Sequence, residues 1–128
     1  MNFPDDLKYT REHEWARLKD GRVQVGITDF AQDQLGDVVY VELPAVGDEV
    51  KRGEAFGVVE STKAVSELFA PVSGKVVEVN DPLVEAPETV NEDPYEEGWM
   101  IAIEPSDQQE LAELLDVKAY AAFVAEQE

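Results

Sequence analysis

Residues 57–67 read Gly-Val-Val-Glu-Ser-Thr-Lys-Ala-Val-Ser-Glu, and this stretch near the middle of the 128-residue chain decides the fold. Apolar residues lead into it and out of it, and a short polar segment lies between them. The pattern predicts two strands joined as a hairpin. Lys63 would lie at the tip, where its ammonium stands on a flexible four-carbon stem. Such a hairpin suits an amine that another enzyme must reach and acylate.

The residues on both sides of this hairpin predict further short strands. An Asp20-Gly21 pair is typical of a tight hairpin turn, and we expect it to join a first strand to a second. Glycine and proline separate the later apolar runs. Strands spaced this closely predict a mainly β fold, a flattened barrel or sandwich of short antiparallel strands. The predicted strands are Tyr9 with Trp15–Leu18, then Val23–Ile27, Val38–Leu43, Glu49–Lys51, Lys75–Val79 and Trp99–Ile103.

One short helix is expected directly after the first hairpin. Thr28 is a favourable N-cap residue for a helix over residues 29–35, and Gly36 can end it. Residues 81–97 are rich in proline and acids, and we expect them to be mainly irregular, with one helical turn near Pro82–Glu85.

The C-terminal residues predict two helices. Ser106 with Gln109 resembles a capping box for a helix that ends at Leu115. Asp116 can cap a second helix, which would carry Tyr120, Phe123 and Val124 on one face. We expect one domain over residues 1–128, with residues 106–128 as its helical C-terminal extension.

The composition excludes several partners. The formal net charge is −19, and residues 81–128 hold fourteen acids but one base. This charge repels nucleic acid and anionic membranes, and it could steer the chain toward basic surfaces or only keep it soluble. No apolar run approaches the roughly 20 residues of a membrane span. The first residues lack signal or transit character, so we expect a cytoplasmic monomer, mitochondrial only if a presequence has been removed.

The sequence predicts neither a catalytic site nor a metal site. His13 is the only histidine and the chain has no cysteine, so any dithiol chemistry must come from a cofactor. We expect His13 to be a packing residue beside Trp15. The serines lack a nucleophile-elbow setting, and among so many acids no spacing selects a catalytic pair.

At this point the motifs resemble a known family. Glu60-Ser61-Thr62-Lys63-Ala64, followed by Ala-Pro-Val-Ser-Gly at 70–74, resembles the lipoyl-attachment hairpin of lipoyl carrier domains. More narrowly, the chain resembles the H proteins of the glycine cleavage system. The resemblance extends over nearly the whole chain, through Leu7-Lys8-Tyr9, His13-Glu14-Trp15, Gly26-Ile27-Thr28, Leu35-Gly36, Val41-Glu42-Leu43-Pro44, Pro94-Tyr95 and Gly98-Trp99-Met100.

The resemblance implies a carrier rather than an enzyme. Lys63 would carry lipoate, attached by a lipoate ligase or a lipoyl/octanoyl transferase that recognises Glu60. A pyridoxal-phosphate glycine decarboxylase would load the aminomethyl group of glycine, and a tetrahydrofolate-dependent aminomethyltransferase would remove it. A dihydrolipoamide dehydrogenase using FAD and NAD would then reoxidise the dithiol.

Acids near the hairpin are candidates for a protective cleft. Because an aminomethyl thioether is labile in water, we expect the loaded arm to fold into a surface cleft that limits water access. The resemblance suggests Glu14 and Glu67 as counter-charges for its ammonium, with Glu12 as a further candidate. All three could equally be ordinary solvated acids.

Other functions remain open on the sequence alone. A biotinyl module usually has methionines beside its lysine, whereas Thr62 and Ala64 flank Lys63. A 2-oxoacid dehydrogenase lipoyl module is usually shorter and tethered by linkers. The same residues also allow a lipoyl or octanoyl relay to other carriers, an unmodified regulatory binding protein of the same fold, or an autonomous enzyme.

Overall fold

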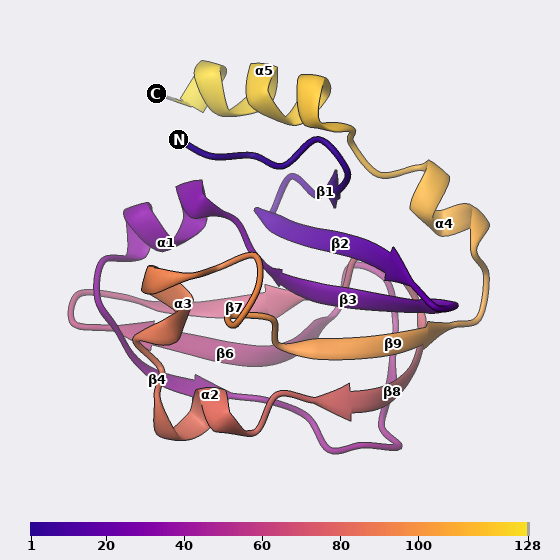
Figure 1. The fold of residues 1–128 in the computed structure, drawn as a ribbon, viewed down its shortest axis with the longest axis horizontal. Helices are drawn as coiled ribbons and strands as arrows, with labels where there is room; N and C mark the ends of the chain where they lie inside the picture. The colour runs from indigo at the N-terminus through magenta and orange to yellow at the C-terminus, as the bar shows by residue number, and fades with distance from the viewer. Residues whose placement is uncertain (128) are drawn as a thin grey trace.

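The computed structural model describes residues 1–127 as two antiparallel sheets with helices along their edges (Figure 1). The six-stranded sheet has the order β1-β2-β3-β9-β8-β5, and the three-stranded sheet has the order β4-β6-β7. This confirms the expected mainly β fold, as an open sandwich rather than a closed barrel. The strands are β1 (Lys8–Tyr9), β2 (Glu14–Lys19), β3 (Arg22–Ile27), β4 (Val38–Glu42), β5 (Glu49–Val50), β6 (Ala55–Ser61), β7 (Val65–Phe69), β8 (Gly74–Val79) and β9 (Ile101–Pro105).

The first hairpin forms as expected. Asp20 and Gly21 have φ values of 54° and 77°, which match a two-residue turn between strands. The predicted first strand is in fact two strands. The chain turns at His13, where φ is 72°, and β1 then pairs with β2 so that Tyr9 lies opposite Trp15.

Helix α1 (Asp29–Leu35) has the predicted ends. The Ala31 amide donates to Thr28 Oγ1 at 3.2 Å, and the Gly36 amide donates to the Gln32 carbonyl at 3.0 Å. Gly36 has a φ of 78°, a conformation that glycine adopts without strain. Local sequence therefore determines this helix.

The segment before β9 has more structure than expected. Helix α2 (Pro82–Glu85) forms as predicted, but a second helical turn follows, α3 (Thr89–Glu92). Tertiary contacts hold α3 in place: Val90 is buried, and the Asn91 side chain accepts from the Val38 amide at 2.8 Å. Strand β9 begins two residues later than predicted, at Ile101.

The two C-terminal helices are only partly as predicted. Helix α4 (Gln109–Ala112) is a single turn and does not extend to Leu115. The expected capping box is wrong, because Ser106 Oγ donates to the Ser73 carbonyl at 3.3 Å instead. Helix α5 (Val117–Gln127) forms as expected, with the Ala119 amide donating to Asp116 Oδ1 at 2.8 Å.

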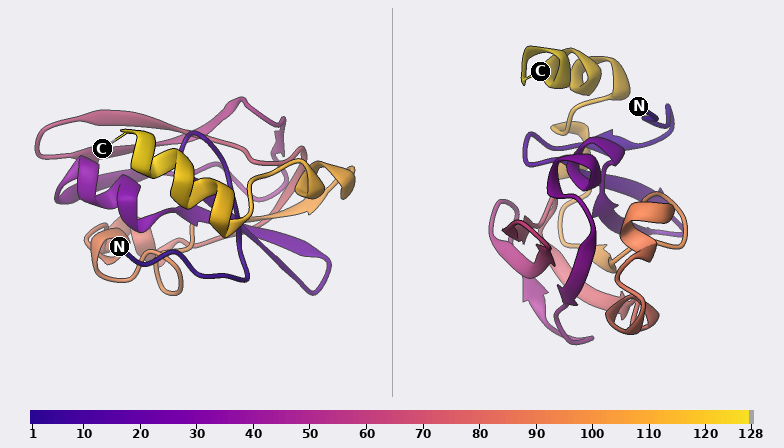
Figure 2. Two further views of the ribbon diagram at one scale, coloured as in Figure 1. Left: turned by 90° about the horizontal axis from the view of Figure 1, so that it is seen from above. Right: turned by 90° about the vertical axis from the view of Figure 1, so that its left-hand side faces the viewer.

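The core consists of two clusters of buried side chains. The larger lies between the sheets, and the smaller lies beneath α5, which crosses above the six-stranded sheet (Figure 2). In the smaller cluster the rings of Tyr9 and Tyr120 stack with centroids 4.6 Å apart. The Tyr9 and Leu115 backbones also exchange hydrogen bonds of 2.8 Å. These contacts attach the C-terminal segment to β1.

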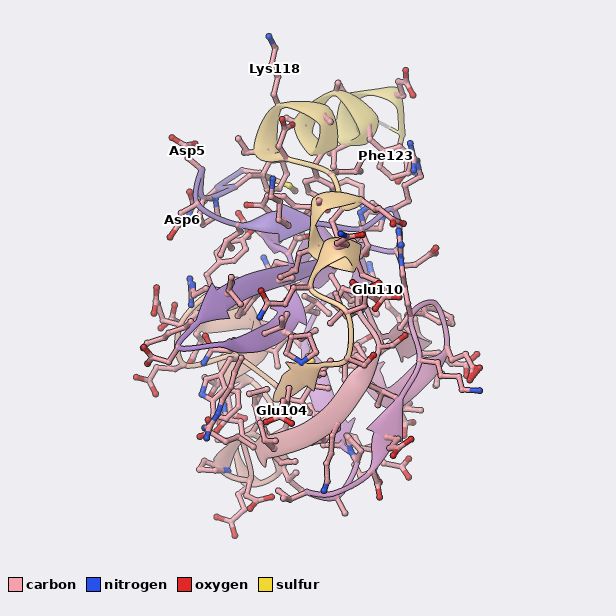
Figure 3. The ribbon with its side chains drawn as sticks, turned by 90° about the vertical axis from the view of Figure 1, so that its right-hand side faces the viewer. Asp5, Asp6, Glu104, Glu110, Lys118 and Phe123 are labelled. Carbon is pink, nitrogen blue, oxygen red and sulfur yellow. The ribbon has the colours of Figure 1, made fainter. Side chains whose placement is uncertain are left out.

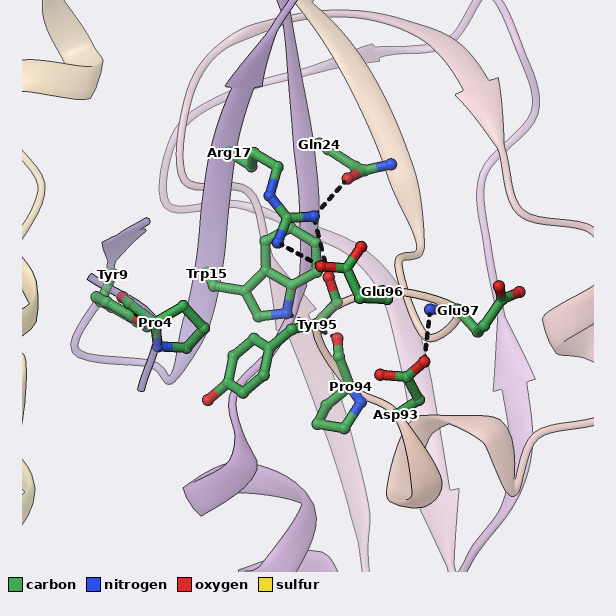
Figure 4. A network of polar contacts seen from close by, with 10 residues as sticks. All are labelled: Pro4, Tyr9, Trp15, Arg17, Gln24, Asp93, Pro94, Tyr95, Glu96 and Glu97. Atoms are coloured by element: carbon green, nitrogen blue, oxygen red, sulfur yellow. Dashed lines mark hydrogen bonds and ion pairs between the residues drawn. The ribbon is translucent and has the colours of Figure 1, made fainter. Parts of the chain in front are cut away.

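Trp15 lies in the smaller cluster. The indole is fully buried, and its Nε1 donates to the Pro94 carbonyl at 2.9 Å (Figure 4). The Arg17 guanidinium lies over the ring, 5.1 Å from the centroid. Together they anchor the segment that follows α3.

The surface is strongly acidic. Among residues 1–127, three ion pairs form: Arg17–Glu96, Arg22–Glu78 and Arg52–Glu113. Lys118, the one base of residues 81–128, projects outward from α5 (Figure 3). Most acids over residues 1–127 therefore face solvent without a paired cation.

Candidate functional site

The lysine hairpin is formed by β6 and β7, and hydrogen bonds between Ser61 and Ala64 close its tip. Glu60 lies opposite Val65 in the register. The Ser61 amide donates to the Ala64 carbonyl at 2.8 Å, and the Ala64 amide donates to Ser61 Oγ at 3.1 Å. Lys63 is exposed at the turn, as predicted. The strands therefore hold the backbone of Lys63 at a defined place on the surface.

The tip rests against the connection between α1 and β4. The Thr62 amide donates to the Asp37 carbonyl at 3.2 Å. A Cβ atom built on Gly36 would lie 3.3 Å from Lys63 Cε, so the missing side chain leaves room for the lysine stem. Asn91 fixes the same connection, because its Nδ2 donates to the Gly36 carbonyl at 2.9 Å.

A cavity of about 590 Å³ lies beside this hairpin, between α1, the edge strand β7 and the end of α5. Its volume is within the range of small-molecule sites. The walls combine apolar side chains with the three acids that the sequence had suggested. The lining residues are Glu12, His13, Glu14, Ile27, Phe30, Ala31, Gln34, Leu35, Val59, Ser66, Glu67, Leu68 and Gln127.

Glu14 is the buried acid of the cavity, with 2% of its surface exposed. Thr10 Oγ1 donates to its Oε1 at 2.7 Å, and the Phe69 amide donates to its Oε2 at 3.2 Å. Burial nevertheless raises the pKa of Glu14 to about 8, because these two hydrogen bonds only partly replace water. A cation seated beside Glu14 would favour the ionised form and expel a proton.

Glu12 and Glu67 differ from Glu14 because both are exposed. Glu67 lies on the edge strand β7 and Glu12 precedes β2, so they approach the cavity from different sheets. The structure thus gathers all three suggested acids around one cavity. Glu60 is elsewhere: it pairs with Tyr40 and Val65 across the three-stranded sheet and does not line the cavity.

His13 links the cavity to α5. Its Nδ1 lies 2.8 Å from the Tyr120 hydroxyl, and its Nε2 lies 3.0 Å from Gln127 Oε1. The Tyr120 hydroxyl lies 2.7 Å from Thr28 Oγ1, so the chain of bonds continues to the cap of α1. Burial lowers the pKa of His13, which favours the neutral ring.

Sequence reasoning missed part of this lining. His13 was expected only to pack, and it does pack against Phe30 with ring centroids 4.8 Å apart. Two facts in the sequence could have pointed to His13 as a cavity residue: it is the sole histidine, and it directly precedes Glu14. Gln34 and Gln127 also line the cavity, and nothing in the local sequence distinguishes them from other exposed glutamines.

Residues 1–127 offer neither a metal-binding cluster nor a membrane-spanning helix. Within this range, acidic and histidine side chains nowhere gather in a group of three suited to a metal ion. Over the same residues, no helix has the length and apolar character to cross a membrane.

An exposed lysine at the tip of a paired hairpin, beside an acid-lined cavity, points to a class of protein: a small β-sandwich carrier. Comparison with known proteins identifies the family. The family model described as "Glycine cleavage H-protein" matches residues 7–127. The chain belongs to this glycine cleavage H-protein family, and its function is that of a carrier in the glycine cleavage system.

Individual relatives match this chain over all or nearly all of their length. The glycine cleavage system H protein of Anaeromyxobacter sp. (strain K) is 76% identical over 128 residues, which covers 100% of both chains. That of Oceanobacillus iheyensis is 61% identical over 97% of this chain and 98% of its own. The crystal structure of a glycine cleavage system H protein from Mycobacterium marinum superposes with a TM-score of 0.90. It is 45% identical and covers 96% of this chain and 99% of its own.

Proposed function

We propose that Lys63 carries lipoate in amide linkage and that the loaded chain moves the aminomethyl group of glycine between enzymes. The donor is the pyridoxal-phosphate glycine decarboxylase, and the acceptor enzyme is the tetrahydrofolate-dependent aminomethyltransferase. A flavin dihydrolipoamide dehydrogenase then restores the disulfide with NAD. One observation supports the proposal above all: the exposed Lys63 stands at the tip of a paired hairpin beside a cavity with a buried acid.

The residues present fit this cofactor. Bound lipoate supplies the dithiol redox chemistry that a chain without cysteine lacks. Lys63 provides the amine, and the cavity of about 590 Å³ offers apolar walls at Ile27, Phe30 and Leu68. Glu60, three residues before Lys63 on β6, is the proposed recognition residue for the lipoate ligase or lipoyl/octanoyl transferase.

The cavity acids are proposed to hold a cationic group and to limit water access. Glu14 supplies a buried carboxyl group whose ionisation a nearby ammonium would favour. Glu12 and Glu67 add negative charge at the rim. Because the pKa of Glu14 is about 8, seating an ammonium at pH 7 should release a proton.

The chain itself is proposed to act as a non-catalytic subunit. Pyridoxal phosphate, folate, FAD and NAD belong to the partner enzymes, and the chain contributes one amine and a protected cavity. Its relatives are bacterial, and we propose that it works in the cytoplasm.

Intact-mass measurement of protein purified from its own cells tests the attachment. We expect a lipoyl mass increment on the wild-type chain and its complete loss in Lys63→Arg, which keeps the charge but cannot form the amide. Lys19→Arg, at the other exposed hairpin, is the matched control and should retain the increment. A biotin increment, no increment, or an increment that survives in Lys63→Arg contradicts the proposal.

A further inference from the structure

The outer face of the three-stranded sheet carries exposed apolar side chains on both sides of Glu60, close in sequence and register to Lys63. The register places Tyr40 opposite Glu60 and Glu60 opposite Val65, so these three side chains share one face. The next row on this face is Glu42, Val58 and Glu67. We call the group Val39, Tyr40 and Val65 the hairpin face.

The hairpin face is unusually exposed for its residue types. Val65 keeps 68% of its surface in water, Val39 keeps 55% and Tyr40 keeps 44%. Val39 is the extra residue at the point where the β4–β6 register shifts, so a bulge turns it outward. Large apolar side chains that share one exposed face with polar neighbours are typical of interaction sites.

We propose that the hairpin face docks the enzyme that acylates Lys63, through an apolar surface of that enzyme bordered by lysine and arginine side chains. This inference rests on the proposed function, because it requires attachment at Lys63. It adds a recognition surface to the single proposed determinant Glu60.

The short reach of the lysine favours the attaching enzyme over the other partners. In the attachment reaction the bond from the acyl carbon to its activating group breaks, an amide bond to Nζ forms, and the ammonium gives up two protons. Four methylene groups separate Nζ from the backbone, so the active site must close around the hairpin tip. Val65 lies two residues from Lys63 and must be covered. After attachment, the longer arm lets other enzymes react without covering these strands.

Charge determines what kind of surface fits. Glu42, Glu60 and Glu67 share the outer face with the apolar side chains, and the whole chain has a net charge of −19. A basic border on the partner complements this pattern and speeds encounter. A second copy of this chain would bring the same acids together, and that repulsion disfavours it as the occupant.

The test compares matched double variants as substrates of the purified ligase, with lipoate and ATP. Tyr40→Thr/Val65→Thr removes the apolar groups and keeps residues that favour strands. Leu18→Thr/Val46→Thr is the control, because these residues are 53% and 64% exposed but lie outside the hairpin. We expect the KM for the carrier to rise about tenfold in the first variant, the typical effect of losing an interface hot spot. The kcat should stay within a factor of about two, and the control should match wild type.

Each other outcome has a defined meaning. If wild type is acylated at Lys63 and the two double variants have equal KM, the docking proposal fails while the proposed function stands. If wild type is not acylated there, the proposed function fails. An equal rise in KM for the glycine decarboxylase, measured with fully lipoylated variants, overturns the assignment to the attaching enzyme. The unfolding temperature of the single variant Val65→Thr shows whether lost stability, and not lost docking, explains a rise in KM.

Discussion

The backbone amide of Phe69 donates a hydrogen bond of 3.2 Å to the carboxyl group of Glu14, which lies 55 residues earlier in the chain. This bond joins β2 of one sheet to β7 of the lysine hairpin. It places a buried acid in the wall of the cavity. The same residue therefore contributes to the sandwich and to the candidate site.

Glu14 should make the folded state less stable as pH rises. Burial raises its pKa to about 8 from an ordinary value of 4.5, so folding favours the protonated form. The contribution of Glu14 to the free energy of unfolding is most favourable below pH 4.5. It falls between pH 4.5 and 8, by about 1.4 kcal/mol per pH unit. Glu14→Gln should remove this dependence. Urea unfolding at pH 5, 6.5 and 8 checks it, with exposed Glu12→Gln as control. A difference between wild type and Glu14→Gln that does not change with pH contradicts the prediction.

The cavity acids should protect the loaded arm. On protein already carrying the aminomethyl group, Glu14→Gln and Glu67→Gln should each speed the release of formaldehyde and ammonia. The effect should be larger at Glu14, because a buried carboxylate attracts a cation more strongly than an exposed one. Glu104→Gln, an exposed acid on β9, is the control. Equal decay rates in all four proteins would remove the protective role.

The cap of α1 should matter more than the serine that resembles a cap. Thr28 Oγ1 accepts from the Ala31 amide and bonds the Tyr120 hydroxyl at 2.7 Å. Thr28→Ala should therefore lower the free energy of unfolding by about 2 kcal/mol. Ser106→Ala should cost less than about 0.5 kcal/mol, since Ser106 is exposed and caps no helix. Chemical denaturation of both variants tests this, and similar losses of stability in the two variants contradict the prediction.

The packing of Trp15 should tolerate no side chain at Gly26. A Cβ atom there would lie 2.6 Å from the indole ring. Burial and the hydrogen bond from Nε1 to the Pro94 carbonyl hold the ring in place (Figure 4). Gly26→Ala should cost about 3 kcal/mol of stability. In Gly21→Ala, nothing lies within 4 Å of the new methyl group, although φ is 77°, so it should lose only about 1 kcal/mol. Thermal unfolding that ranks Gly21→Ala as the worse variant contradicts this account.

The elements that the sequence predicted well are those with local causes. The Asp20-Gly21 turn and the Thr28 cap each depend on residues a few positions apart. Helix α3 escaped prediction because its stability comes from the burial of Val90 and from the bond between Asn91 and Val38. Ser106 misled because the capping-box pattern was satisfied in sequence, while Ser73 offered its side chain a tertiary partner.

The residues of the candidate site divide in the same way, into those predictable from the local sequence and those placed by tertiary contacts. Lys63 could be placed on an exposed tip because strand and turn signals surround it. The burial of Glu14 could not be inferred, since it depends on Phe69 arriving from another sheet. The contribution of Gln127 depends on α5 crossing back to His13, and that path is decided by the stacking of Tyr9 on Tyr120.

The course of α5 also decides where the chain can be extended for laboratory use. Its last turn brings Gln127 to the cavity wall, so an affinity tag or fluorescent fusion placed after it would begin at the mouth of the binding space. A tag inserted at the Asp20-Gly21 turn would emerge at the opposite end of the molecule from the lysine hairpin (Figure 1). Assays of arm transfer should therefore use the second design.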